Sequence, residues 1–114
     1  MDKSKLITQL RLHEGVKSKV YRDILGIETI GVGRNLEDKG LSDDEIDYLL
    51  ENDIKDVEKD LKQFCRWWEK LDEVRQRAIA DLVFNMGITR FLTFKKTINH
   101  LQNERFVEAG DELL

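Results

Sequence analysis

The sequence predicts an α+β fold that is mostly α-helical, in which a small lobe with a β-hairpin is joined by one long helix to a helical lobe. Apolar residues recur at steps of three and four along most of the 114 residues, as in amphipathic helices. One segment changes to a two-residue alternation, which is typical of strands. Proline is absent, which suits a mostly helical chain. We expect a single domain with a hairpin lobe at about residues 15–41, a connecting helix at 42–66 and a helical lobe at 67–114.

The first helix is predicted at residues 2–14, packed with the helical lobe, and it ends on an acid. Glu14 lies four residues after Leu10 and seven after Ile7, so it extends the apolar stripe. Gly15 follows, as expected just past a helix end. The negative end of the helix dipole and partial burial both favour a Glu14 that keeps its proton. A water-exposed glutamate at a helix end is the plainer alternative.

A hairpin is predicted at residues 15–35, with a further short strand near Leu36. Its first strand is predicted at residues 19–24, and Gly26 marks a turn among apolar residues. On the plainer view, Asp23 is simply a turn carboxylate.

The return strand of this hairpin places Thr29, Gly31 and Gly33 on one face. A face with one hydroxyl and two missing side chains leaves room for another molecule to approach the backbone closely. The plainer view makes Thr29 an ordinary strand residue and the glycines bulge positions. Each residue taken alone therefore favours a structural role.

The long connecting helix is predicted to begin at a capping box, in which Ser42 and Glu45 hydrogen-bond each other's backbone. Acidic residues from Asp43 to Asp60 scatter around this helix and lack the ligand order of a calcium loop, so we expect a solvated face. An apolar stripe at steps of three and four fits one helix of some five or six turns: Ile46, Leu50, Ile54, Val57, Leu61 and Phe64.

Two features mark the junction with the helical lobe. Trp67 and Trp68 are adjacent and point about 100° apart on a helix, so at least one is expected to pack in the core rather than stack on sugar. Cys65 is the single cysteine, which excludes an intramolecular disulfide, and it is expected to be a small buried hydrophobe.

Three further helices are predicted in the lobe, at residues 71–86, 91–102 and 105–114. Gly87 is expected to end the first of them. The buried side of that helix is predicted to comprise Leu71, Val74, Ala78, Leu82 and Phe84 to Met86.

Taken together, Glu14, Asp23 and Thr29 form a specific pattern, with eight residues between the first two and five between the last two. Embedded in LRLHEG, YRD and TIGVG, this spacing resembles the catalytic segment of the bacteriophage-type lysozymes, the endolysins of glycoside hydrolase family 24. The similarity continues through LDEVRQRA and VFNMG, so it covers nearly the whole chain.

The resemblance implies a muramidase, which hydrolyses the β-1,4 bond between N-acetylmuramic acid and N-acetylglucosamine in peptidoglycan, with inversion and without a cofactor. Glu14 would protonate the leaving oxygen, Asp23 would activate water or stabilise the positive centre, and Thr29 would hold the water. Asn85 would face the cleft and bind sugar, although a helix-end asparagine can simply satisfy nearby carbonyls. Gly31 would let the substrate approach the backbone.

The chain departs from the family pattern at two places. Arg34 stands where the family has histidine after Gly-x-Gly, and we expect it to bind substrate through the lactyl carboxylate or to pair with Asp23. The family also continues with further helices past the position of Leu114, so the helical lobe is expected to be C-terminally incomplete. Self-association is one way to cover the apolar surface left there. The alternative function is a truncated, non-catalytic lysozyme-like fragment that binds glycan or a protein partner.

Other classes of protein are disfavoured. The net charge of −4 argues against nucleic-acid partners. His13 and His100 stand apart from each other and from any cysteine cluster, so no metal site is expected. No apolar run approaches the ~20 residues of a membrane span, and no secretory signal is evident, so no stable membrane association is expected. By the resemblance, the protein would wait in the host cytoplasm and act on the periplasmic cell wall after holin-dependent release.

Overall fold

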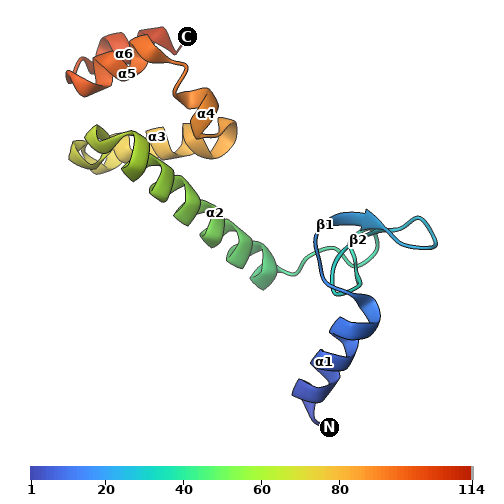
Figure 1. Ribbon diagram of the computed structural model, residues 1–114. Coiled ribbons are helices and arrows are strands. Elements are labelled where there is room, and N and C mark those ends of the chain that lie inside the picture. Colours follow the sequence, from blue (N-terminus) through green and yellow to red (C-terminus); the bar gives the residue numbers. More distant parts are fainter. Residues whose placement is uncertain (114) are drawn as a thin grey trace. The chain divides into compact units, whose positions relative to one another are not determined.

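Helices make up most of the computed structural model, which describes residues 1–113 (Figure 1). A three-stranded antiparallel sheet accompanies them, so the predicted α+β class is confirmed. The chain divides into two compact units, Met1–Ile46, which holds the sheet, and Asp47–Leu114, which is helical. Within the described residues, no helix combines the length and the apolar composition that crossing a membrane requires.

Helix α1 (Lys3–Glu14) has the boundaries that local capping predicts. The Asp2 carboxylate accepts a hydrogen bond from the Lys5 amide at 3.1 Å, which satisfies one free N–H of the first turn. At the other end, Gly15 adopts φ +75° and donates its N–H to the Arg11 carbonyl at 3.0 Å. All 12 residues of α1 are described and none is buried. The packing of this helix with the helical lobe stays a prediction.

Three short strands form the sheet: β1 (Lys17–Arg22), β2 (Glu28–Gly31) and β3 (Arg34–Asn35). They follow in the order β1-β2-β3, and each is antiparallel to the next. Tyr21 pairs with Thr29 across β1 and β2. The predicted hairpin is confirmed, and β3 lies beside the position at which the sequence predicts a third strand.

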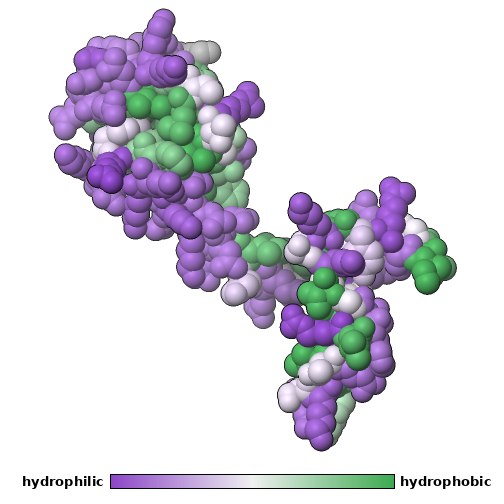
Figure 2. Space-filling view, viewed as in Figure 1, coloured by the Kyte–Doolittle hydropathy of each residue, from purple (hydrophilic) through white to green (hydrophobic). Residues whose placement is uncertain are grey.

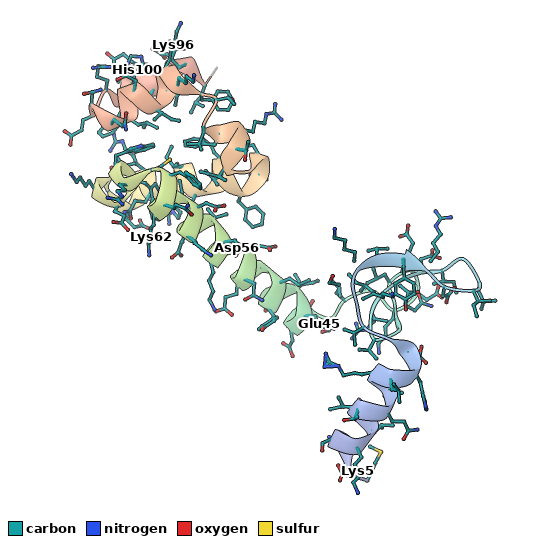
Figure 3. The ribbon with its side chains drawn as sticks, in the orientation of Figure 1. Lys5, Glu45, Asp56, Lys62, Lys96 and His100 are labelled. Carbon is teal, nitrogen blue, oxygen red and sulfur yellow. The ribbon has the colours of Figure 1, made fainter. Side chains whose placement is uncertain are left out.

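Helix α2 (Asp43–Phe64) begins at the predicted capping box. The Glu45 amide donates to Ser42 Oγ at 3.3 Å, and the Ser42 amide donates to Glu45 Oε1 at 2.9 Å. Figure 3 marks Glu45 at this end of the helix. The reciprocal bonds confirm that a purely local signal sets the start of α2.

The apolar stripe of α2 is buried in its C-terminal part. Leu61 is fully buried and Val57 packs against the core, because the core of the second unit gathers around this end of the helix. The other members of the stripe are between 44% and 51% exposed: Ile46, Leu50, Ile54 and Phe64. The prediction that the stripe belongs to one helix is confirmed, and Leu61 is its one fully buried member within the described residues.

The core of the second unit lies where the last turns of α2 meet the helices that follow. These are η1 (Arg66–Lys70), α3 (Glu73–Met86), α4 (Ile88–Phe91), α5 (Lys95–Gln102) and α6 (Phe106–Glu112). Their buried side chains form one cluster: Leu61, Cys65, Trp68, Ile79, Val83, Phe91, Leu101 and Ala109. Figure 2 shows apolar surface gathered among these helices, and α5 and α6 lie side by side in Figure 1. The predicted burial of Cys65 and of one tryptophan, Trp68, is confirmed.

Helix α3 buries a different face from the one predicted. Ile79 and Val83 are its buried residues. Trp68 and Phe91 belong to the same cluster, so these neighbours select the face of α3 that faces the core. Four residues of the predicted buried side are exposed instead: Val74, Ala78, Phe84 and Asn85.

The last predicted helices are divided differently in the structure. Phe91 ends α4, and Phe94 has the non-helical ψ of 64°, so α5 begins at Lys95. Helix α6 corresponds to the last predicted helix as far as Glu112, and Leu114 lies outside the described residues.

Candidate active site

Glu14 is the last residue of α1, and its side chain lies against the backbone of Gly33. A Cβ atom built on Gly33 would come within 2.9 Å of Glu14 Oε2 and within 3.4 Å of its Cδ. The carboxyl group therefore occupies space that only glycine leaves open. Glu14 is exposed, so the burial expected from the apolar stripe is not found within the first unit.

Gly33 is required at this turn for a second reason. Its φ of +65° lies in the left-handed region, which costs other L-residues about 1–2 kcal/mol. The sequence places Gly33 on an open strand face but gives no sign of its contact with Glu14. The two glycines of Gly-Val-Gly were the available signal, because closely spaced glycines mark a tight turn or a close approach.

Asp23 holds together the loop between β1 and β2. Its Oδ1 accepts hydrogen bonds from the Leu25 amide at 2.8 Å and the Ile27 amide at 2.9 Å. Within the described residues, both bonds fall on Oδ1, which leaves Oδ2 for water or a ligand. The carboxylate thus fills the plainer role of a turn residue and still presents one oxygen for chemistry.

Thr29 is buried on β2, with 4% of its surface exposed. Its hydroxyl donates to the Ile27 carbonyl at 2.8 Å, so the lone pairs of Oγ1 are what it can offer to a water molecule. The Ile27 backbone therefore connects two predicted site residues, since its N–H binds Asp23 and its carbonyl binds Thr29. Sequence reasoning missed Ile27 because an apolar side chain does not reveal what its backbone does.

Arg34 is paired with Glu45. Arg34 Nη2 lies 2.7 Å from Glu45 Oε2, and Nη1 donates to Glu45 Oε1 at 2.8 Å and to the Gly40 carbonyl at 2.9 Å. Hydrogen bonds from Arg34, and then from Ser42, lower the pKa of Glu45 from 4.5 to about 2. The expected pairing of Arg34 with Asp23 is therefore wrong. Binding of a substrate carboxylate by Arg34 stays a prediction, and such a carboxylate would compete with Glu45.

Gly31, the other glycine of the predicted substrate face, has open space where a Cβ would lie. Its φ is +71°, and no atom lies within 4 Å of a Cβ built on it. Room beside this backbone therefore exists, and substrate binding there stays a prediction.

Asn85 belongs to the second unit, whereas the other predicted site residues belong to the first. Its Nδ2 donates to the Asp81 carbonyl at 2.9 Å and to Asp81 Oδ1 at 2.8 Å. These bonds realise the plainer role, in which the asparagine satisfies a carbonyl near the helix end. A contact with sugar stays a prediction.

A cavity of about 480 Å³ lies in the second unit, and none of the predicted site residues lines it. Its apolar walls come from α2, η1 and α3: Leu50, Ile54, Val57, Trp68, Ala80 and Phe84. Polar and charged side chains complete its lining: Glu58, Glu73, Gln76, Arg77 and Asp81. The cavity is therefore described separately from the candidate site residues of the first unit.

The first unit offers acid–base chemistry. Within residues 1–113, no group of three or more His, Cys, Asp or Glu side chains could hold a metal ion. The carboxyl groups of this unit include those of Glu14 and Asp23, and the Thr29 hydroxyl is tied to Asp23 through Ile27. Two carboxyl groups suit hydrolysis of a glycosidic bond, because one protonates the leaving oxygen while the other assists water.

Comparison with known proteins agrees with this chemistry. Residues 11–114 match the family model described as phage lysozyme. Probable T4-type lysozyme 1 of Dictyostelium discoideum is 26% identical over 139 residues, which covers 96% of this chain and 82% of that protein. The endolysin of Salmonella phage P22 is 28% identical over 116 residues, which covers 95% of this chain and 77% of that protein. The Dictyostelium alignment is longer than this 114-residue chain, so that relative holds internal residues with no counterpart here. Because the family model spans far more than half of the sequence, the chain belongs to the phage lysozyme family.

Proposed function

We propose that the protein is a muramidase that hydrolyses the β-1,4 bond between N-acetylmuramic acid and N-acetylglucosamine in peptidoglycan during lysis of a phage host. The observation that carries this proposal is the placement of Glu14 against Gly33, in the same unit in which Ile27 ties Asp23 to Thr29. Membership of the phage lysozyme family supports it. The site of action is the periplasmic cell wall, reached from the host cytoplasm after a holin opens the membrane.

Each residue of the candidate site has a role in the proposed mechanism. The protonated carboxyl group of Glu14 gives its proton to O4 of N-acetylglucosamine as the bond from O4 to C1 of N-acetylmuramic acid breaks. A water molecule attacks C1 and passes a proton to Asp23. Thr29 accepts a hydrogen bond from this water, since its own proton goes to the Ile27 carbonyl.

The stereochemistry of the product tests this mechanism. Water that attacks from the face opposite the leaving oxygen inverts C1, so the new reducing end is released as the α anomer. Proton NMR of a freshly cleaved soluble glycan should show this anomer before mutarotation. Initial release of the β anomer would indicate a covalent intermediate and would remove the direct role of water.

Turbidity loss of chloroform-permeabilised Gram-negative cells tests the activity itself. We expect the unchanged chain to clear the suspension and Glu14→Gln to fold without clearing it. Glu28→Gln, at an exposed glutamate on β2 of the same unit, is the matched control and should clear normally. Clearing by Glu14→Gln at the full rate would exclude Glu14 as the acid. A folded chain that binds purified sacculi without clearing cells would establish the non-catalytic, glycan-binding alternative.

A further inference from the structure

The ion pair between Arg34 and Glu45 differs from the other ion pairs of the described chain. The others join residues three or four positions apart on one helix, as in Arg75 with Asp72. Arg34 and Glu45 lie 11 positions apart and join β3 to the first turn of α2. Their side chains are 27% and 39% exposed, the lowest fractions among these pairs. Water and salt therefore weaken this pair less than the others.

The carboxylate of Glu45 is held by Ser42 as well as by Arg34. Glu45 Oε1 accepts the Ser42 amide at 2.9 Å, so the side chain is part of the capping box of α2. Both oxygens of this carboxylate meet the guanidinium, in the two-point geometry that arginine forms and lysine does not. Arg34 also donates to the Gly40 carbonyl, which ties down the loop between β3 and α2. The guanidinium is thus held by three oxygen atoms, two of the Glu45 carboxylate and one of the Gly40 backbone.

Arg34 is the residue directly after Gly33, whose backbone lies beneath the carboxyl group of Glu14. Arg34 also pairs with Ile30 of β2, at the other end of the same turn. A side chain that fixes position 34 therefore limits where the peptide of Gly33 can move. Movement of Gly33 toward or away from α1 would change the space available to Glu14.

We infer that Arg34 is a positioning residue, whose ion pair with Glu45 holds Gly33 against Glu14 and so fixes the direction in which the acid presents its proton. This inference rests on the proposed function for its effect on catalysis. It assigns Arg34 to the protein's own carboxylate, in contrast to the substrate-binding role predicted from the sequence. The positioning role and the substrate-binding role predict different kinetic effects when Glu45 is replaced.

Steady-state kinetics on a soluble peptidoglycan oligomer separates these roles. We expect Arg34→Gln and Glu45→Gln each to lower kcat by about ten- to a hundredfold, the cost of misplacing a reacting group, with KM nearly unchanged. The double variant should be no worse than either single variant, because both remove the same pair. Arg34→Lys should recover part of kcat. If Arg34 binds substrate instead, Arg34→Gln raises KM, whereas Glu45→Gln frees the guanidinium and leaves KM unchanged or lower.

An NMR readout tests the inference without hydrolysis. Glu14→Gln should shift the Gly33 amide signal of the unchanged chain, because the carboxyl group lies against the Gly33 backbone, and this shift is the response of Gly33. The same substitution is then made in each variant background. We expect Arg34→Gln and Glu45→Gln to keep a dispersed spectrum but to weaken the response of Gly33. Arg75→Gln, which breaks an exposed ion pair in the second unit, is the matched control and should leave the response intact.

Failure of the positioning role and failure of the proposed function give different results in this experiment. An undiminished Gly33 response in Arg34→Gln, Glu45→Gln and Arg34→Lys would overturn the positioning role, whatever the activity. A chain without hydrolytic activity whose Gly33 response still depends on Arg34 would overturn the proposed function and leave the structural link standing.

Discussion

The carboxyl group of Glu14 and the backbone of Gly33 are in direct contact, so that a Cβ at position 33 would lie 2.9 Å from Glu14 Oε2. Replacing Gly33 is therefore a way to displace Glu14 without altering Glu14 itself. Because the obstructing atom is the end of a flexible side chain, the carboxyl group can swing aside and the fold can survive.

Gly33→Ala should consequently lose activity while it remains folded. We expect kcat to fall by about a hundredfold, as for a misplaced catalytic group, and the free energy of unfolding to fall by about 1–2 kcal/mol from the left-handed φ. Gly87→Ala is the matched control, since Gly87 has φ +83° and no atom lies within 4 Å of a Cβ built on it. It should show the same loss of stability with full activity. Equal activity of the two variants would show that the contact with Glu14 does not matter.

Asp23 combines a structural and a chemical role, and two substitutions separate them. Asp23→Asn keeps an oxygen that can accept from the Leu25 and Ile27 amides but removes the charge. We expect near-normal thermal stability and a loss of activity of at least about a hundredfold. Asp23→Ala should lose activity and also about 1–2 kcal/mol of stability, because the two amides lose their acceptor. An active Asp23→Asn would leave Asp23 as a turn residue only.

The contribution of Thr29 to activity should depend on its hydroxyl group and not on the shape of its side chain. Thr29→Val removes both the bond to the Ile27 carbonyl and the acceptor for water. We expect kcat to fall by about tenfold or more and the free energy of unfolding to fall by about 1 kcal/mol. Thr29→Ser retains the hydroxyl and should keep most of the activity. Kinetics and urea unfolding on both variants provide the check. A valine variant as active as the serine variant would remove Thr29 from the water site.

The contribution of Glu45 to stability should depend on pH in a defined range. The folded-state pKa is lowered from 4.5 to about 2, so the stabilisation is complete above pH 4.5 and is lost as the pH falls toward 2. Urea unfolding, followed by the amide signals of β2, should find Glu45→Gln less stable than the unchanged chain at pH 6. The difference should shrink below pH 4.5. A difference that stays constant down to pH 2.5 would contradict the ion pair.

Local signals in the sequence predicted much of this structure. The reciprocal bonds of Ser42 and Glu45 and the glycine at position 15 act within a few residues, so the ends of α1 and the start of α2 could be read directly. The buried face of α3 could not be predicted in this way. Ile79 and Val83 belong to one cluster with Trp68 and Phe91, and spacing does not say which neighbours will pack.

The candidate site divides in the same way. Glu14, Asp23 and Thr29 were identifiable by their spacing, which resembles a known catalytic segment. The partner of Arg34 could not be identified from the sequence, because Glu45 is 11 positions away and is one of several acidic residues at the start of α2. The roles of Gly33 and Ile27 depend on backbone atoms, which are the same in every residue and leave little trace in the sequence.

Mass spectrometry of the fragments released from purified sacculi tests the central claim most directly. A muramidase that uses water leaves fragments whose reducing end is N-acetylmuramic acid, which borohydride reduces. We expect these ends from the unchanged chain and from Glu28→Gln, and none from Glu14→Gln. Fragments that end in reducing N-acetylglucosamine or in an anhydro sugar, or their release by Glu14→Gln, would contradict the account.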